Sequence, residues 1–129
     1  MLNLVDSSGW VEYFENGTNA DYFASGIQET SSLIVPTICL YEVFKRMSQR
    51  RGEDEALQAV SFMTLGTVID LNQAIAISAA QISLEHKLAM ADSLILATAR
   101  AQEAILWTQD EHFEGLAGVR YIQKPSLAY

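Results

Sequence analysis

The sequence predicts an α/β fold, a three-layer α/β/α sandwich with a mainly parallel sheet of about five strands. Short apolar runs alternate along the chain with longer stretches of helical character, and this alternation is typical of a parallel sheet covered on both faces. The chain has 129 residues, half of them hydrophobic, which is enough for one domain with one core. We therefore expect a single domain over residues 1–129.

Five short apolar runs have the length and character of strands. They are residues 2–5, 33–35, 67–70, 104–107 and 119–122. Continuous apolar runs of this length are typical of strands that are buried on both faces of a sheet.

Six stretches between these runs carry signals for the start or end of a helix. They cover residues 8–15, 20–29, 37–51, 53–66, 73–88 and 91–102. Ser7 or Ser8, Asn19 and Asn72 stand where N-caps of three of these helices are expected. Gly52 ends the third helix, and the three acidic residues that follow suit the first turn of the fourth.

The predicted helix of residues 73–88 is apolar on two sides. One stripe consists of Ile75, Ala79 and Ile82. The other stripe consists of Ile77, Ala80, Leu84 and Leu88. A helix that is apolar on two sides is either central or lies at an interface.

Composition and charge limit the possible classes of protein. The net charge of −8 argues against generic electrostatic adhesion to nucleic acid. Cys39 is the only cysteine, which excludes an internal disulfide. Because the chain also lacks a long apolar run and a signal-peptide pattern, we expect a cytoplasmic protein that does not enter the membrane.

The basic residues are unevenly distributed. Four of the eight lie within seven positions, one helical turn after Glu42: Lys45, Arg46, Arg50 and Arg51. Such a cluster is compatible with phosphate binding and equally with the solvated end of a helix, where cations favour the helix dipole.

Four acidic residues stand near the carboxyl ends of the predicted strands. Asp6 follows the first strand, and Asp110 follows the fourth. Glu42 lies about a turn into the helix after the second strand, and Asp92 opens the last helix. Ligands of open α/β sheets bind at the carboxyl ends of the strands. Since carboxylates gathered there would repel one another, the pattern predicts a site for Mg²⁺ or Mn²⁺, which prefer oxygen ligands.

Each acid taken alone also has a structural explanation. Asp6 could cap a helix, and Glu42 could pair with a lysine or arginine three or four residues later. Asp92 could be a first-turn residue favoured by the helix dipole, and Asp110 a turn residue. The order of all four along the chain is what favours a metal site.

Four segments together resemble a known family. They are Leu4-Val5-Asp6-Ser7-Ser8, the stretch from Val35 to Glu42, the stretch from Ala91 to Ala99, and Trp107-Thr108-Gln109-Asp110 followed by Phe113. In order and spacing they resemble PIN-domain nucleases, most closely the VapC-type ribonuclease toxins of toxin–antitoxin pairs. The resemblance extends over essentially the whole chain.

The resemblance implies roles for individual residues. The metal-binding catalytic acids would be Asp6, Glu42, Asp92 and Asp110. Ser7 or Ser8 and Thr108 would supply hydroxyls around the metal, and Lys45 and Arg46 would contact the substrate. Many relatives carry a further acid at the position of His112, and its replacement by histidine would affect the site of a second metal ion.

The resemblance also implies an activity and partners. The protein would be an Mg²⁺- or Mn²⁺-dependent endoribonuclease that hydrolyses RNA phosphodiesters as the toxin of a type II toxin–antitoxin system. It would form a homodimer. A small antitoxin would inhibit it by inserting an arginine or lysine into the cleft.

Three other classes remain as alternatives. A degenerate PIN domain would be a non-catalytic binding scaffold, although all four acids are present here. A phosphatase of the haloacid-dehalogenase type would use Asp6 as nucleophile, but it needs a second aspartate where Ser8 stands. A von Willebrand A-type adhesion module needs a serine where Trp10 stands.

Overall fold

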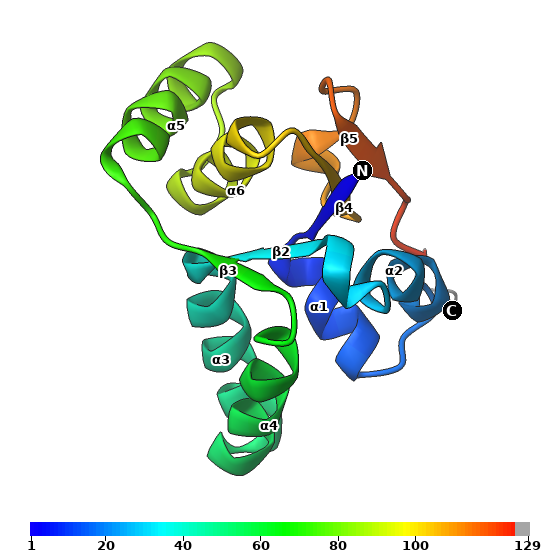
Figure 1. Cartoon of the computed structure of the whole chain (residues 1–129). Coiled ribbons are helices and arrows are strands. Elements are labelled where there is room, and N and C mark those ends of the chain that lie inside the picture. The colour runs from blue at the N-terminus through cyan, green and yellow to red at the C-terminus, as the bar shows by residue number, and fades with distance from the viewer. Residues whose placement is uncertain (126–129) are drawn as a thin grey trace.

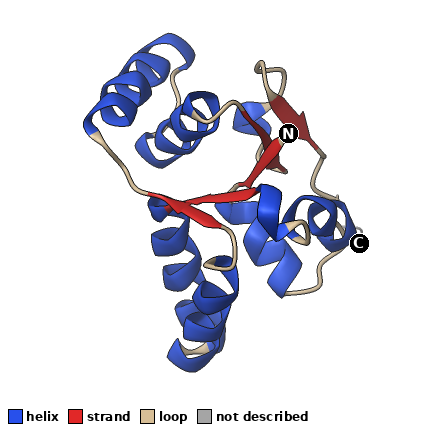
Figure 2. Ribbon diagram, in the orientation of Figure 1, coloured by secondary structure: helices blue, strands red, loops and turns tan. Residues whose placement is uncertain are grey.

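Five parallel strands form one sheet in the order β3-β2-β1-β4-β5. The computed structural model describes residues 1–125, and helices lie on both sides of its sheet (Figure 1 and Figure 2). The strands are β1 (Leu2–Val5), β2 (Leu33–Pro36), β3 (Thr67–Ile69), β4 (Ala104–Thr108) and β5 (Val119–Tyr121). The predicted α/β fold with a parallel sheet of five strands is confirmed.

Six α-helices and two 3₁₀ turns connect these strands within residues 1–125. Between β1 and β2 lie α1 (Ser7–Phe14), α2 (Ala20–Ile27) and the turn η1 (Thr30–Ser32). Between β2 and β3 lie α3 (Thr37–Arg51) and α4 (Glu53–Met63). Between β3 and β4 lie α5 (Gln73–His86) and α6 (Met90–Ala101), and η2 (Glu111–Phe113) precedes β5.

The strand order places a switch point beside the central strand. From β1 the chain runs outward through β2 to β3, then returns to the other side of β1 as β4. The register pairs Asn3 with Leu33 of β2 and with Ile105 of β4. At a reversal of this kind the loops diverge and leave a crevice at the carboxyl ends of the strands. The backbone nitrogen of Asp6 still donates to the carbonyl of Trp107 at 3.1 Å, so β1 and β4 end side by side.

The core consists of apolar side chains from the strands and from the facing sides of the helices. Leu4, Val35 and Leu106 on three adjacent strands are fully buried. Helix α2 contacts β1, and α6 contacts β4, so the middle strands are covered by helix. The largest fully buried aromatic side chains are Trp10, Phe23 and Phe113. A buried parallel sheet explains why these strands read as continuous apolar runs.

Two of the three predicted N-caps do not form the capping hydrogen bonds that we expected. Helix α1 is capped by Asp6, not by Ser7 or Ser8, because the Asp6 carboxylate accepts from the backbone nitrogen of Gly9 at 2.9 Å. Asn19 is at the N-cap position of α2, but its side chain makes no capping hydrogen bond and donates instead to Gln109 Oε1 at 3.0 Å. The third predicted cap is confirmed, since the Asn72 side chain accepts from the backbone nitrogen of Ile75 at 2.9 Å.

The predicted C-terminal ends of two helices are also wrong. The helix predicted to reach about residue 29 ends at Ile27, and η1 follows it. The helix predicted to reach about residue 66 ends at Met63. A side chain on Gly66 would come within 3.0 Å of Leu33, so the chain passes too close to β2 there for another residue type.

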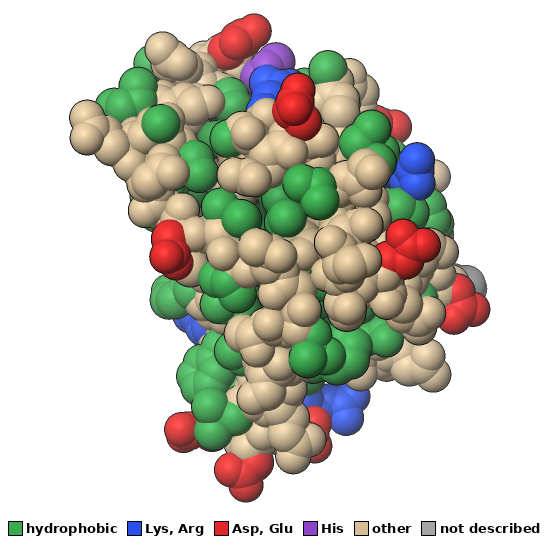
Figure 3. All heavy atoms as spheres, in the orientation of Figure 1, with side chains coloured by type: hydrophobic (Ala, Val, Ile, Leu, Met, Phe, Trp, Pro, Cys, Tyr) green, Lys and Arg blue, Asp and Glu red, His purple; other side chains and the backbone are tan. Residues whose placement is uncertain are grey.

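Only one of the two apolar stripes on α5 is wholly buried. Ile75, Ala79 and Ile82 are buried, whereas Ile77 is 59% exposed and Leu84 is 84% exposed. Hydrophobic side chains reach the surface over α5 in the space-filling view (Figure 3). The helix is therefore not central, and its outer side is an exposed apolar surface.

Within residues 1–125, no helix is long and apolar enough to cross a lipid bilayer.

The same substitution on the two sides of α5 should have different effects. Ile75→Ala leaves a cavity against the core, so we expect it to lower the free energy of unfolding by about 2 to 5 kcal/mol. Ile77→Ala is the matched control and should change it by less than about 0.5 kcal/mol. Urea unfolding measures both variants, and equal losses would contradict this packing of α5.

Candidate metal centre

The carboxyl edge of the central strands holds a cavity of about 200 Å³. Its lining residues come from α1, α3, α6 and the segments after β1, β4 and β5: Asp6, Ser7, Ser8, Val11, Glu42, Arg46, Asp92, Ile95, Asp110 and Lys124. All four predicted acids are among them. The cavity lies at the switch point between β1 and β4, where the topology leaves a crevice.

Asp6 is buried, with 3% of its surface exposed. One carboxylate oxygen accepts from the Ser8 hydroxyl and the Gly9 nitrogen, each at 2.9 Å. The other accepts from the Thr108 hydroxyl at 2.6 Å. Burial raises the pKa of Asp6 to about 6, although the hydrogen bonds from Thr108, Gly9 and Ser8 oppose that rise and the charge of Asp110 adds to it.

Thr108 joins two of the acids. Its side chain is fully buried at the end of β4. The hydroxyl donates to Asp6 and accepts from the backbone nitrogen of Asp110 at 2.9 Å. A single hydroxyl therefore fixes the Asp6 side chain relative to the backbone that carries Asp110.

Glu42 is held by a second serine. The Ser7 hydroxyl, in the first turn of α1, donates to Glu42 Oε1 at 2.6 Å. Glu42 projects from α3, so this bond connects helices that begin after β1 and after β2. Ser7 and Ser8 thus each orient a different carboxylate.

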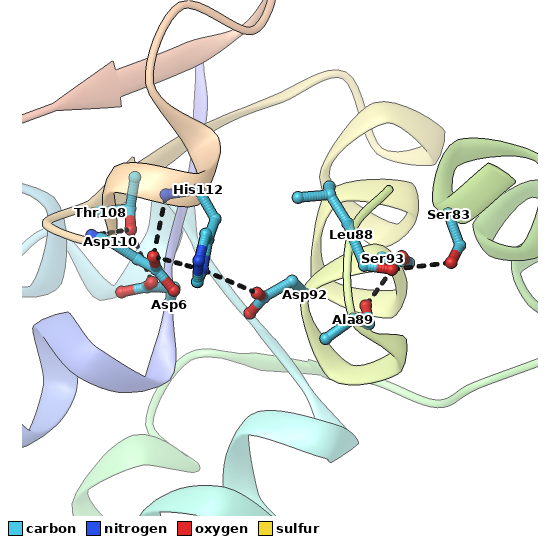
Figure 4. Close-up of polar contacts among 9 residues, drawn as sticks. All are labelled: Asp6, Ser83, Leu88, Ala89, Asp92, Ser93, Thr108, Asp110 and His112. Carbon is cyan, nitrogen blue, oxygen red and sulfur yellow. Dashed lines mark hydrogen bonds and ion pairs between the residues drawn. The ribbon is translucent and has the colours of Figure 1, made fainter. Parts of the chain in front are cut away.

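Asp92 lies in the first turn of α6, with 21% of its side chain exposed. Burial raises its pKa to about 6, the charges of Asp110 and Glu42 raise it further, and His112 lowers it. His112 Nδ1 lies 3.0 Å from Asp110 Oδ1 and 3.9 Å from Asp92 Oδ2 (Figure 4). Within residues 1–125, these three residues form a group whose donor atoms all lie within 4.8 Å of one another. Asp6 and Glu42 line the same cavity but stand outside that tight group.

The donor set suits a divalent cation. Carboxylate oxygens are the ligands that Mg²⁺ and Mn²⁺ prefer, and imidazole nitrogen is a further ligand for transition metals. The pKa values of Asp6 and Asp92 are both raised, which shows that the cavity disfavours their negative charges. A bound cation would remove that penalty. Asp92, Asp110 and His112 could hold it, because their donor atoms lie within 4.8 Å of one another.

The predicted basic residues separate in the structure. Arg46 lines the cavity. Lys45 is absent from that lining, and its ammonium lies 5.8 Å from the centroid of the Tyr41 ring. Arg50 and Arg51 pair with Glu15 at the end of α1. Only Arg46 of this cluster therefore faces the acids.

Sequence reasoning missed Lys124 as a cavity residue. It follows β5 and joins Arg46 in the lining of the acidic cavity. Its position just beyond the carboxyl end of a predicted strand was the available signal, since the ends of all parallel strands meet at one edge.

Removing one charge from the cavity should stabilise the metal-free protein at neutral pH. An aspartate with a raised folded-state pKa stabilises the fold below about pH 4 and loses that contribution as the pH rises through about 6. Asp92→Asn stays neutral throughout. In EDTA near pH 7.5 the free energy of unfolding of this variant should therefore exceed that of the wild type by roughly 1 kcal/mol, after allowance for solvent screening. Its melting temperature should accordingly be a few degrees higher.

That difference should shrink as the pH falls through about 6 and vanish near pH 4, where Asp92 is protonated in both states. Thermal melts from pH 4 to 8 measure it. Identical melting temperatures over the whole range would contradict the repulsion proposed for the cavity.

The comparisons with known proteins agree with this fold. The sequence profile of the PIN domain matches residues 4–119. No curated protein sequence matches the chain significantly. Three of the most similar solved structures come from toxin–antitoxin systems.

The first is a toxin–antitoxin complex from Klebsiella pneumoniae, 24% identical, with a TM-score of 0.77 over 92% of this chain and 95% of that one. The second is VapC20 from Mycobacterium tuberculosis, named as a toxin that cleaves the sarcin-ricin loop, 15% identical with a TM-score of 0.73 over 88% and 94%. The third is the DNA-bound VapBC of Salmonella typhimurium, 20% identical with a TM-score of 0.72 over 95% and 98%. At these identities the structures establish a shared fold, and the profile match over most of the sequence establishes the family. The chain belongs to the PIN-domain family.

Proposed function

We propose that this protein is a metal-dependent endoribonuclease and the toxin of a type II toxin–antitoxin pair, acting as a single PIN-like domain in the cytoplasm. The observation that carries the proposal is that Asp6, Glu42, Asp92 and Asp110, which are up to 104 positions apart in the sequence, line one cavity at the carboxyl edge of the sheet. The proposed metal is Mg²⁺ or Mn²⁺.

Different residues of the site would have different roles. A bound divalent ion would polarise a phosphate oxygen and lower the pKa of a water molecule. Asp92 and Asp110 would hold the ion. Asp6 is fixed by Thr108 and Ser8, and Glu42 by Ser7, so both carboxylates are oriented before substrate arrives. Such fixed acceptors would orient a water beside the phosphate with little reorganisation.

Phosphate binding is assigned to Arg46 and Lys124. Both line the acidic cavity and a second hollow that adjoins it along α1. An overall charge of −8 repels RNA, so cations beside the reacting phosphate are needed to offset that repulsion. The sequence suggested Lys45 as well, but its place over Tyr41 makes it a weaker candidate than Lys124.

The proposed protein partner is a small antitoxin. The solved relatives include toxin–antitoxin complexes from Klebsiella pneumoniae and Salmonella typhimurium. An arginine or lysine of the partner would neutralise the carboxylates of the cavity in place of the metal. A cationic side chain fits there because burial, and then the charges of neighbouring carboxylates, raise the pKa values of Asp6 and Asp92, and a cation would stabilise their ionised forms.

A non-catalytic PIN scaffold is the alternative function. It would use the same surface to bind a partner without cleaving RNA. The presence of all four acids in one cavity, two of them with dedicated hydroxyl donors, favours the enzyme.

Cleavage should depend on Asp92 and on the metal. Asp92→Asn removes a direct ligand, so the rate of RNA cleavage should fall by more than the roughly 10- to 100-fold that loss of an outer partner costs. EDTA should abolish cleavage, and added Mg²⁺ or Mn²⁺ should restore it. Asp70→Asn is the matched control, because Asp70 is exposed after β3 and does not line the cavity.

The measurement is sequencing of RNA ends after brief induction in cells, followed by cleavage of the identified RNA by purified protein. Cleavage that persists in Asp92→Asn or in EDTA would refute the metal-dependent mechanism. Failure of the wild type to cut any RNA would favour the scaffold.

We also propose a homodimer formed through an apolar groove. The groove, of about 220 Å³, lies between α3, α6 and the segment after β3, and Tyr41 and Leu71 rim it. Their side chains are 59% and 51% exposed, and an apolar surface of this kind is typical of a protein–protein contact. Light scattering at micromolar concentration should give the mass of a dimer.

Leu71→Asp should convert the dimer to a monomer, because it would bury a charge in the contact. Leu57→Asp is the matched control, since Leu57 is 50% exposed on α4 and lies outside the groove. Circular dichroism checks that both variants fold. A wild-type monomer, or equal loss of dimer in both variants, would contradict this interface.

A further inference from the structure

The imidazole of His112 faces the two carboxylates that are placed to hold the metal. Its Nδ1 atom lies 3.0 Å from Asp110 Oδ1 and 3.9 Å from Asp92 Oδ2 (Figure 4). The side chain is 68% exposed, so the ring is not forced into the site by packing around it. Its direction is set by the backbone that carries it and by the contact with Asp110.

That backbone is fixed on both sides. Asp110 caps η2, and its carboxylate accepts from the backbone nitrogen of His112 at 3.0 Å. Thr108 accepts from the backbone nitrogen of Asp110, which ties the start of the turn to β4. Phe113 is fully buried and anchors the end of the turn in the core. The turn therefore presents His112 on the same side as the Asp110 carboxylate.

The donor atoms have the spacing of ligands around one ion. With metal–oxygen bonds of about 2.1 Å, neighbouring ligands of an octahedral ion are about 3.0 Å apart and opposite ligands about 4.2 Å apart. The distance from Nδ1 to Asp110 matches neighbouring ligands, and the distance to Asp92 lies between the two values. A small rotation of the exposed His112 side chain would complete the arrangement.

We propose that His112 is a direct nitrogen ligand of the divalent ion, together with Asp92 and Asp110, and that it makes the centre prefer Mn²⁺ to Mg²⁺. This inference rests on the proposed function, because it concerns the same metal site. Both ions prefer oxygen ligands, but Mn²⁺ belongs to the first-row transition metals that bind sites with nitrogen ligands, so it accepts an imidazole more readily than Mg²⁺, which keeps its waters. A neutral imidazole also contributes less charge than a carboxylate, which weakens the binding of Mg²⁺ more than that of Mn²⁺.

The competing explanation is that His112 only pairs with Asp110 as a cation. In that case the ring would leave the site when a metal ion arrived. The two explanations differ in one observable, which is the presence of a nitrogen atom bonded to the metal.

Pulsed electron paramagnetic resonance of the Mn²⁺-loaded protein detects such a bond through the coupling of Mn²⁺ to ¹⁴N. The chain has only two histidines, so with no histidine tag the assignment needs two variants. We expect the coupling in the wild type and in His86→Ala, and its loss in His112→Ala. His86 is the matched control because it lies at the end of α5 beside Glu85 and is outside the group formed by Asp92, Asp110 and His112.

Calorimetric titration with each ion measures the preference of the site for Mn²⁺ over Mg²⁺. His112→Ala should lower the affinity for Mn²⁺ by at least about tenfold, since even outer partners of metal ligands are worth about 10- to 100-fold. Its affinity for Mg²⁺ should change much less. His112→Asp should gain affinity for Mg²⁺ and narrow the preference, which shows that the position and not the fold is responsible.

The outcomes separate this inference from the proposed function. A wild type that cleaves RNA but shows no ¹⁴N coupling, or an unchanged ratio of Mn²⁺ to Mg²⁺ affinity in His112→Ala, overturns the inference and leaves the nuclease intact. A coupling that depends on His112 in a protein that cuts no RNA supports the ligand assignment and overturns the nuclease.

Discussion

Repulsion among carboxylates at one edge of a buried sheet is the constraint on which the site depends. The strand order brings the ends of β1 and β4 together, so the acids that follow these strands lie close to one another. Burial then raises the pKa values of Asp6 and Asp92, because an ionised carboxylate loses its hydration in the cavity. In the proposed function, a bound cation would offset this cost.

Hydrogen bonds from hydroxyl groups stabilise the carboxylates and fix their positions. Thr108 serves as donor to Asp6 and acceptor from Asp110, while Ser7 and Ser8 each donate to a different acid. Hydrogen bonds to the charged form lower the pKa of a carboxyl group and so oppose the effect of burial. Because the donors come from α1 and β4, the rigid elements of the fold orient the acids before any ligand is present.

Local signals in the sequence were sufficient for the strands and for the four acids, since strand runs are continuous and each acid has a fixed place relative to one. They were insufficient where a side chain had a distant partner. Asn19 is predicted to be a cap but bonds to Gln109, 90 positions away. Arg50 belongs to a basic cluster that is equally compatible with phosphate binding and with a solvated helix end, and it pairs with Glu15, 35 positions away. Lys124 becomes a neighbour of Arg46 only once the fifth strand is placed at the edge of the sheet. Asp6 combines two roles that the sequence presented as alternatives, since it caps α1 and also lines the cavity.

The central claim is that the cavity between β1 and β4 holds a divalent ion. The most direct measurement is a crystal structure of the protein soaked in Mn²⁺, with anomalous diffraction to locate the metal. We expect one strong anomalous peak within bonding distance of the Asp92 and Asp110 carboxylates. A cavity without a peak, or manganese bound only at other surfaces, would contradict it.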